Sequence, residues 1–370
     1  MGPKRKKRGG GAQRRRPLSE LQRFARHGDL LHDGQFIVTR VDLAHGQVFD
    51  NKGRKLAWHE IDAYEGDLYT DQKCAPSYMG VRNWFGIERE DTQYGVSQMD
   101  DTRHNKWRAN YDANLPLIER GAGDVEPADV VYLVASGPGL ERNAQELTRI
   151  TNGVKVAVNW TMDWASANGL GDDIFDYYVC IDYFIDPRSA VEHPNTIGVF
   201  DVVVNPKVPQ RVFKDRRWFC SAAQTGNPVG KLAKERDPFL PDYDSGLNVL
   251  FSAMQWVTMG LKAKTVVFVG ADCALTWNRY HCGEWADYKR FIPAEFTVVE
   301  DIHGHVVVTT KMLNDIADWM QAAFFFMQRA GVRVINATES GILDQYCELK
   351  PLADTVDELN GTGGDNEIRV

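Results

Sequence analysis

The stretch DVVYLVASGPGLERN, residues 129–143, joins an unbroken apolar run to a Gly-Pro-Gly turn and a helix-forming sequence. A strand that is apolar without alternation is buried on both faces, which is typical of a parallel sheet covered by helices. Similar apolar runs recur at VKVAVNW (154–160) and KTVVFVGAD (264–272). These segments predict parallel strands of one sheet, each followed by a turn at the same edge.

The rest of the chain from residue 129 onward continues this alternation of strands and helices. Further strands are expected at 176–184, 196–204, 216–222 and 332–338, and helices at 141–150, 161–170, 245–261 and 309–331. The expected fold class is α/β, with a mostly parallel, Rossmann-like sheet and helices on both faces.

The chain of 370 residues divides into four expected parts. Residues 126–350 form the Rossmann-like nucleotide-binding domain, and residues 17–125 form a small α+β region that includes a helix over 106–120. Residues 1–16 are expected to be a disordered basic tail, and residues 351–370 a flexible C-terminal tail.

The net charge of −8 is the sum of two unlike parts. Residues 1–16 carry eight Lys or Arg and no acid, whereas the rest of the chain carries 35 basic and 51 acidic residues, a net charge of −16. The body is too acidic to bind nucleic acid by charge alone. The tail is compatible with a solvated segment, a polyanion-binding arm or a localisation signal.

The composition also indicates in which cellular compartment the protein is expected. The sequence has no run of ~18 apolar residues, so no membrane span is expected. No apolar segment follows the basic N-terminus as a secretory signal requires, and six cysteines in 370 residues are too few for a disulfide scaffold. We therefore expect a cytoplasmic protein.

Ligands of such sheets bind at the carboxyl ends of the strands, so the residues that follow each strand are the site candidates. They are Ser136, Gly137, Pro138, Gly139, Asn159, Asp182 and Asp272, together with Ser245 and Gly246 at a helix start. Glycines allow close backbone approach, and a helix N-terminus attracts anions, which favours a phosphate site. A tight turn between strand and helix is the alternative explanation of the Gly-Pro-Gly sequence.

Other polar groups leave their roles open. Asp182 and Asp272 could bind Mg²⁺ or hydroxyl groups, or cap helices. His303 and His305 are expected in a turn between two apolar runs, as a structural pair, a catalytic base or metal ligands. Cys273, His281 and Cys282 lack the CxxC spacing and the fourth ligand of a zinc site.

The order of these motifs resembles a known superfamily. VYLVASGPGLERN, VAVNW, YYVCIDYF, the long block from Asp244 to Leu275 and VVVTTKML…VRVINATESGIL are similar to the 6-hydroxymethylpterin diphosphokinase MptE-like superfamily. Within it they look most like the Maf-type flagellin glycosyltransferases (motility accessory factors) and the bacterial CMP-sialic-acid sialyltransferases. The resemblance covers about residues 130–345.

The resemblance implies a role for each matching residue. It places Ser136, Gly137, Pro138 and Gly139 at the nucleotide phosphate, and Asn159, Asp182, Ser245, Gly246 and Asp272 around the nucleotide. His305 or His303 would be the catalytic base, and Tyr280, Tyr288 or Arg279 would stabilise the departing phosphate. Two departures stand out: Gly139 replaces the serine of the GPSL-type turn, and the acidic Mg-ATP stretch of the kinases is only partly present in CIDYFID.

Three functions follow as hypotheses. The first is a glycosyltransferase that moves a sugar from a nucleotide-activated donor, such as a CMP-nonulosonate, to an acceptor that is a protein, a glycan or a nucleic acid, without a cofactor. The second is a Mg²⁺-dependent, ATP-using diphosphokinase of a pterin-type substrate, with Asp182 and Asp272 as metal ligands. The third is a non-catalytic accessory protein that binds nucleotides or, through its basic tail, a polyanion.

Overall fold

The computed structural model describes residues 30–32, 36–42, 47–50, 101–185, 187, 192–221, 228–243, 248–285 and 296–361. The expectations for the basic tail 1–16 and for the residues between these ranges lie outside this part of the chain.

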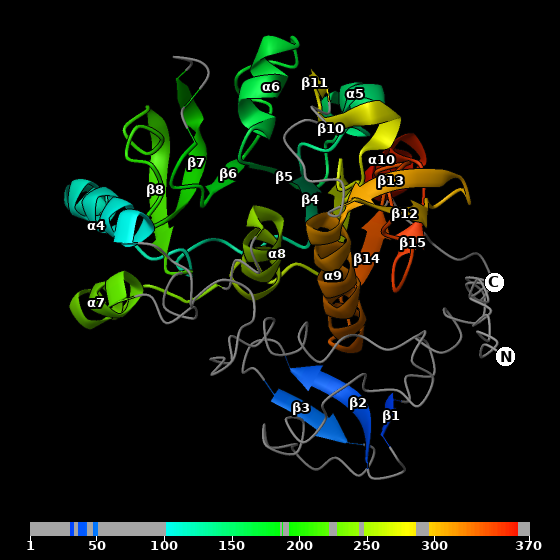
Figure 1. Ribbon diagram of the computed structural model, residues 1–370, viewed down its shortest axis with the longest axis horizontal. Coiled ribbons are helices and arrows are strands. Elements are labelled where there is room, and N and C mark those ends of the chain that lie inside the picture. Colours follow the sequence, from blue (N-terminus) through cyan, green and yellow to red (C-terminus); the bar gives the residue numbers. More distant parts are fainter. Residues whose placement is uncertain are drawn as a thin grey trace, which may run out of the picture.

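The core of the molecule is an eight-stranded sheet in the order β15-β14-β9-β4-β5-β6-β7-β8 (Figure 1). Its strands are β4 (Val130–Val134), β5 (Val154–Val158), β6 (Tyr177–Cys180), β7 (His193–Asp201), β8 (Phe213–Phe219), β9 (Thr265–Val269), β14 (Arg333–Asn336) and β15 (Glu348–Leu349). Neighbouring strands are parallel at each pairing within it. The expected α/β class is confirmed.

Helices cover both faces of this sheet. One face packs against α8 (Val249–Met259) and α9 (Lys311–Arg329). The other packs against α4 (Asp101–Asn114), α5 (Leu140–Asn143), the 3-10 helix η3 (Ala144–Arg149), α6 (Thr161–Ala167), α7 (Pro228–Arg236) and α10 (Leu352–Gly361).

Strand β4 shows why an unbroken apolar run was needed. Val131 and Leu133 belong to the core on the α8–α9 face, whereas Tyr132 and Val134 belong to the core on the opposite face. All four side chains are fully buried. Because alternate residues of a strand point to opposite sides, a sheet covered on both faces needs apolar residues at every position.

Smaller elements complete the described structure. They are the antiparallel sheet of β1 (Leu30–His32), β2 (Phe36–Asp42) and β3 (Gln47–Asp50), the 3-10 helices η2 (Leu115–Leu117) and η5 (Thr276–Asn278), and the hairpins β10 (Arg279–His281) with β11 (Glu284–Trp285) and β12 (Phe296–Glu300) with β13 (Val306–Thr310). The second hairpin carries the expected turn at His303 and His305.

Helix α4 is fastened to the sheet by two asparagines. Asn110 Nδ2 donates to the carbonyl oxygens of Tyr183 and Val203 at 3.1 and 3.0 Å, and Asn114 Nδ2 donates to those of Val202 and Val204. The packed α/β unit therefore already includes α4, although the sequence placed this helix in the region before residue 126.

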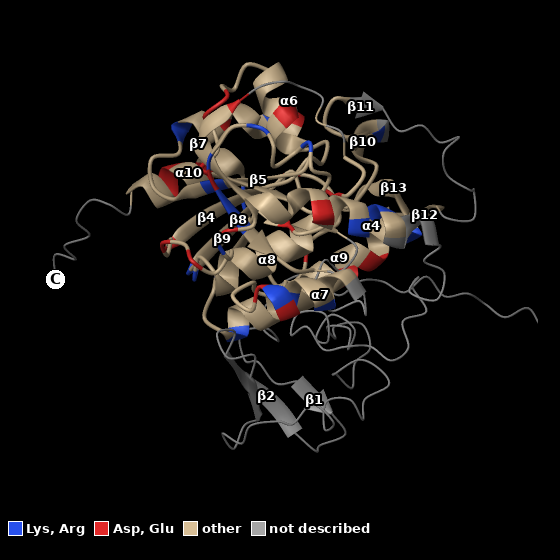
Figure 2. Cartoon of the chain, turned by 90° about the vertical axis from the view of Figure 1, so that its left-hand side faces the viewer, with Lys and Arg blue, Asp and Glu red and all other residues tan. Residues whose placement is uncertain are grey.

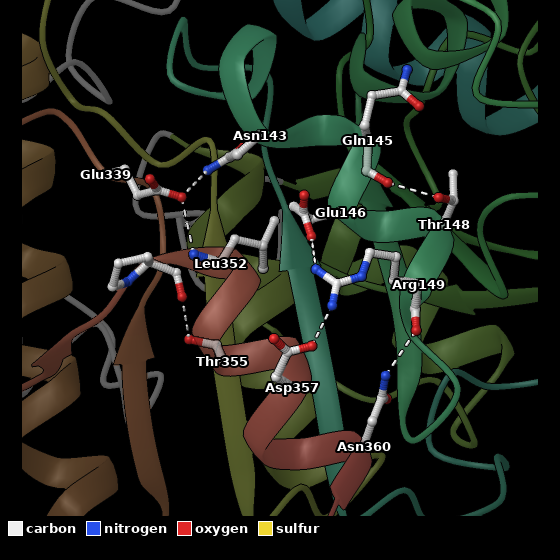
Figure 3. A network of polar contacts seen from close by, with 11 residues as sticks. Asn143, Gln145, Glu146, Thr148, Arg149, Glu339, Leu352, Thr355, Asp357 and Asn360 are labelled. Carbon is white, nitrogen blue, oxygen red and sulfur yellow. Dashed lines mark hydrogen bonds and ion pairs between the residues drawn. The ribbon is translucent and has the colours of Figure 1, made fainter.

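The expectation of a flexible tail from residue 351 is wrong for Leu352–Gly361, which form α10 (Figure 3). Leu352, Val356 and Leu359 lie on one face of this helix and are buried in the core. The helix is also held by polar contacts: Asn360 Nδ2 donates to the carbonyl oxygen of Arg149 at 2.8 Å, and Asp357 pairs with the Arg149 guanidinium.

Charged residues are present on α7 and absent from the buried helix α8 (Figure 2). Helix α8 carries no charged residue and is buried along nearly its whole length, whereas α7 carries both lysines and acids.

No described helix combines the length and the apolar character that crossing a membrane requires.

We expect Phe324→Ala to lower the free energy of unfolding by about 3–5 kcal/mol. Phe324 is fully buried at the centre of α9, and its ring centroid lies 4.7 Å from that of Phe268 on β9. Chemical denaturation followed by circular dichroism measures the change. Phe239→Ala is the matched control, because Phe239 is 49% exposed and its removal leaves no buried cavity. Equal losses in the two variants would contradict the assigned core.

Candidate functional site

A pocket of about 600 Å³ lies where the carboxyl ends of the strands meet the N-termini of α8 and α9. Its polar wall consists of residues that follow six adjacent strands, and its apolar wall includes Val249, Leu250, Met312, Leu313 and Ile316 from the two helices. This is the position at which parallel α/β sheets bind ligands.

The sequence-predicted residues divide into three groups. Ser136, Gly137, Pro138, Asn159, Asp182, Asp272 and Tyr280 line the pocket. Gly139, Arg279, His303 and His305 are not among the lining residues. Ser245, Gly246 and Tyr288 lie outside the described part of the chain.

The Gly-Pro-Gly turn uses its N–H groups inside the protein. Gly137 N–H donates to the carbonyl oxygen of Gly270 at 2.7 Å, and Gly139 N–H donates to Asp272 Oδ2 at 3.0 Å. Leu140 and Glu141 N–H donate back to the carbonyl oxygens of Gly137 and Pro138. Helix α5, which follows, has only four residues. These contacts favour the structural explanation of the turn over a phosphate cradle built from its amides.

Asp272 connects the turns that follow three strands. It is 1% exposed; its Oδ2 accepts the N–H of Gly139 after β4, and its Oδ1 accepts the hydroxyl of Ser340 after β14 at 2.7 Å. Burial raises the pKa of Asp272, although the hydrogen bonds from Ser340 and Gly139 oppose this shift. Its carboxylate is thus committed to holding the strand ends together.

The space around Gly139 explains why this chain has glycine there. A Cβ atom on Gly139 would lie 2.4 Å from Ser340 Oγ and 2.8 Å from the carbonyl oxygen of Thr338. The backbone at Gly139 has φ −55° and ψ −32°, which any residue can adopt. The requirement for glycine is therefore steric, and Ser340 occupies the volume that a serine at 139 would need.

The N-terminus of α8 opens into the pocket. Asn248 caps this 11-residue helix by accepting the N–H of Leu250 through its side chain at 2.9 Å, and Asn248, Val249 and Leu250 all line the pocket. The N-terminal end of a helix carries a partial positive charge that stabilises anions. This agrees with the expected helix start after Ser245 and Gly246.

His281 is the pocket residue whose importance the sequence did not reveal. Its Nδ1 lies 3.2 Å from Ser136 Oγ, and both residues line the pocket. The Tyr280 ring is edge-on to the imidazole with 4.4 Å between the centroids. His281 follows β9 by 12 residues, and no catalytic role was predicted for it from the sequence.

The loop that carries His281 is anchored on α5. Arg279 Nη1 pairs with Glu141 Oε1 at 2.9 Å, and the Arg142 guanidinium lies 3.5 Å from the ring centroid of Trp277. Trp277 has a φ of +51°, an unusual backbone conformation for a bulky side chain. Arg279 is thus an anchor of the loop in this structure.

His303 and His305 lie on the β12–β13 turn, and both are exposed. His303 Nε2 is 3.0 Å from the carbonyl oxygen of Glu339, and His305 Nδ1 is 3.5 Å from Asp301 Oδ2. Neither histidine lines the pocket, so their positions do not favour either one as a catalytic base there.

Asn159 has an unusual backbone conformation and a buried side-chain oxygen without a hydrogen-bond donor in the described part of the chain. Its φ is +43°, and its Oδ1 accepts no hydrogen bond within the described part of the chain. A strained residue at the carboxyl end of a central strand is a frequent property of binding sites. Its position in the pocket agrees with the predicted contact to a nucleotide.

The carboxylates do not form an evident metal centre. Asp182 Oδ1 accepts the N–H groups of Phe184 and Ile185 at 2.8 and 3.2 Å, and both oxygens of Asp272 are occupied as described above. Strands β4 and β5 lie between the strands that precede Asp182 and Asp272. In the described ranges no three His, Cys, Asp or Glu residues are grouped so as to hold a metal ion.

Comparisons with known proteins give one distant similarity. No family model matches the chain, and no curated protein matches it. Among solved structures, the MAf glycosyltransferase of Magnetospirillum magneticum AMB-1 aligns with a TM-score of 0.48 and 13% sequence identity, over 70% of this chain and 41% of that one. The chain thus spans less than half of that protein, and no residue's role follows from the alignment.

We expect Gly139→Ser to lower the free energy of unfolding by about 1–3 kcal/mol, because the new side chain overlaps Ser340 Oγ. Ser340→Ala in the same chain removes that oxygen, so the double variant should lose less than the sum of the two single variants. Denaturant titrations of all four proteins measure this coupling. Gly123→Ser is the control, since a Cβ there has no atom within 4 Å. Additive losses would refute the steric explanation.

Proposed function

We propose that this chain is a glycosyltransferase that transfers a sugar from a nucleotide-activated donor, of which a CMP-nonulosonate is one candidate, to an acceptor hydroxyl. The reaction class comes from the ordered motifs that resemble the Maf-type enzymes and the sialyltransferases. The observation that carries the proposal is a histidine, His281, hydrogen bonded to a hydroxyl inside a pocket at the carboxyl edge of a parallel sheet.

His281 is our candidate for the general base, in place of His305 or His303. In the tautomer whose Nδ1–H donates to Ser136 Oγ, the imidazole is oriented and its Nε2 carries the lone pair that accepts a proton. An acceptor hydroxyl bound next to this nitrogen would lose its proton as its oxygen bonds to the sugar. Ser136 would then be a positioning residue for the base.

The phosphate of the donor is assigned to the N-terminus of α8. The amides of the Gly137–Gly139 turn are already hydrogen bonded, whereas the helix end lined by Asn248, Val249 and Leu250 faces the pocket. As the bond from the anomeric carbon to the phosphate oxygen breaks, the electron pair leaves with the phosphate. The positive end of the helix dipole stabilises this growing negative charge.

Among the residues expected to assist the departing phosphate, Tyr280 is the best placed. It lines the pocket beside His281, whereas Arg279 is paired with Glu141. Asn159, which lines the pocket after β5, would contact the base or the ribose of the nucleotide. No metal takes part in the proposed transfer.

The first test is a thermal-shift panel of CMP, UDP, GDP, AMP and ATP, each with and without Mg²⁺. We expect CMP or UDP to raise the melting temperature by about 3–8 °C at saturation, whether or not Mg²⁺ is present, because the ligand binds only the folded state. Stabilisation by Mg-ATP alone would replace this proposal by the diphosphokinase. No shift with any nucleotide would favour the accessory protein.

The second test separates the two positions for the base. The donor in this test is a nucleotide sugar that raises the melting temperature of the protein, and water is the acceptor. We expect His281→Ala to slow the release of the nucleotide from this donor by about 10²–10⁴-fold. Nucleotide affinity should change less than threefold, since the base contacts the acceptor. His305→Ala and His303→Ala are measured in parallel. A large loss in either of these and normal activity in His281→Ala would return the base to the β12–β13 turn.

A further inference from the structure

The pocket continues well beyond the residues assigned to the nucleotide. Ser136 follows β4 and Ser221 follows β8, and both line the same pocket. Four neighbour-to-neighbour steps separate β4 from β8 in the sheet. At ~4.8 Å per step this is roughly 19 Å. A nucleotide phosphate near α8 therefore leaves the β7–β8 end of the pocket for another part of the ligand.

A buried carboxyl group lies directly behind this end. Asp201, the last residue of β7, is fully buried; its Oδ1 accepts the N–H of Val203 at 2.9 Å, and its Oδ2 accepts the N–H of Ser221 at 3.2 Å. The hydroxyl of Ser221 also contacts Asp201 Oδ2. In the described chain no Lys, Arg or His forms an ion pair with Asp201. Ser221 is the group through which Asp201 can act on the pocket.

The state of Asp201 decides what Ser221 offers to a ligand. When Asp201 is ionised, the Ser221 O–H donates to it, and the lone pairs of Ser221 Oγ are left to accept a hydrogen bond from the pocket side. Burial raises the pKa of Asp201 to about 7. Cys220 is the titratable side chain whose charge couples to Asp201, and burial raises its pKa as well.

Aromatic side chains form the neighbouring wall. Trp107 of α4 and Tyr183 after β6 both line the pocket, with ring centroids 5.5 Å apart and planes at 85°. Asn110, one helical turn after Trp107, donates to the carbonyl oxygens of Tyr183 and Val203. Through Val203, whose N–H donates to Asp201 Oδ1, the helix that carries Trp107 is tied to the end of β7. An aromatic surface next to a hydrogen-bond acceptor matches a ring with an apolar C–H face and hydroxyl groups at its edge.

We propose that this β7–β8 end of the pocket, formed by Ser221, Trp107 and Tyr183 with Asp201 behind Ser221, is the subsite for the sugar ring of the donor. Ser221 Oγ accepts a hydrogen bond from a sugar hydroxyl, and Asp201 is the positioning residue that turns the Ser221 proton away from the ligand. The inference rests on the proposed function, because it assigns the nucleotide to the other end of the pocket.

The test compares a nucleotide with its sugar conjugate. Calorimetric affinities are measured for CMP and CMP-N-acetylneuraminate, and for UDP and UDP-N-acetylglucosamine, with the whole chain. We expect Ser221→Ala to weaken the conjugate that binds by about 5- to 10-fold, the effect of one lost hydrogen bond, and to change the affinity of the bare nucleotide less than twofold. Ser221→Thr keeps the hydroxyl and should restore affinity for the conjugate.

A pH series distinguishes a positioning role for Asp201 from a purely structural one. As pH rises through about 7, Asp201 ionises and Ser221 becomes an acceptor, so the affinity of the conjugate relative to the bare nucleotide should increase. Ser221→Ala should lack this contribution. The second ionisation of the bare nucleotide's phosphate, with a pKa of about 6, affects the ratio equally in both proteins and is removed by comparing them. Thr355→Ala is the control: it removes a buried hydroxyl that bonds the carbonyl oxygen of Pro351 at 2.8 Å on α10, and it should leave both affinities unchanged.

The outcomes separate the two proposals. If nucleotides and conjugates bind but Ser221→Ala weakens both equally, or neither, the sugar subsite is overturned and the nucleotide site stands. If the ratio of the two affinities has the same pH dependence across pH 6–8 in the unmodified protein and in Ser221→Ala, the role of Asp201 is overturned. If no nucleotide and no conjugate binds the unmodified chain, both the subsite and the proposed function fail.

Discussion

The hydrogen bonds of one buried carboxylate, Asp272, hold the carboxyl edge of the sheet together. Asp272 follows β9, and it accepts a hydrogen bond from the turn after β4 and another from the loop after β14. These three segments can approach so closely only because glycines stand at the contacts: a Cβ on Gly137 would lie 2.3 Å from Asp272 Oδ2. The pocket wall is rigid where these turns meet, and the pocket begins beside them.

This packing determines which groups of the site remain to bind a ligand. A glycine-rich turn after the first strand of an α/β domain suggests a phosphate cradle, but here the amides of the turn already have acceptors within the protein. The positive end of a helix dipole that faces the pocket is the N-terminus of α8, and the hydroxyl–imidazole pair of Ser136 and His281 lines the same pocket. In an acidic protein body, such local dipoles matter more to an anionic ligand than the net charge does.

The carboxyl groups of Asp272 and Asp201 have one property in common: burial and hydrogen bonding shift the pKa of each in opposite directions. Asp272 and Asp201 are both fully buried at strand ends, and both have a raised pKa because burial outweighs the hydrogen bonds that they accept. Asp272 bonds only to groups that hold the fold. Asp272 lines the pocket with both of its oxygens hydrogen bonded within the protein, whereas Asp201 lies behind Ser221 and can act on a ligand through that hydroxyl.

The fold class followed from the sequence because burial on two faces needs continuous apolar strands, as in β4 and in β9 after its first residue. The same local pattern located Ser136, Asn159 and Asp272 at strand ends, and the pocket does contain them. Only the tertiary structure decided which polar groups meet. His281 reaches Ser136 across 145 positions of chain, and the expected base residues His303 and His305 stay on an exposed turn. Helix α10 was likewise not predicted from the sequence, and its contacts with η3 show that it is part of the packed structure. Periodicity reports the burial of each segment on its own, whereas a site depends on contacts between segments that are far apart in the sequence.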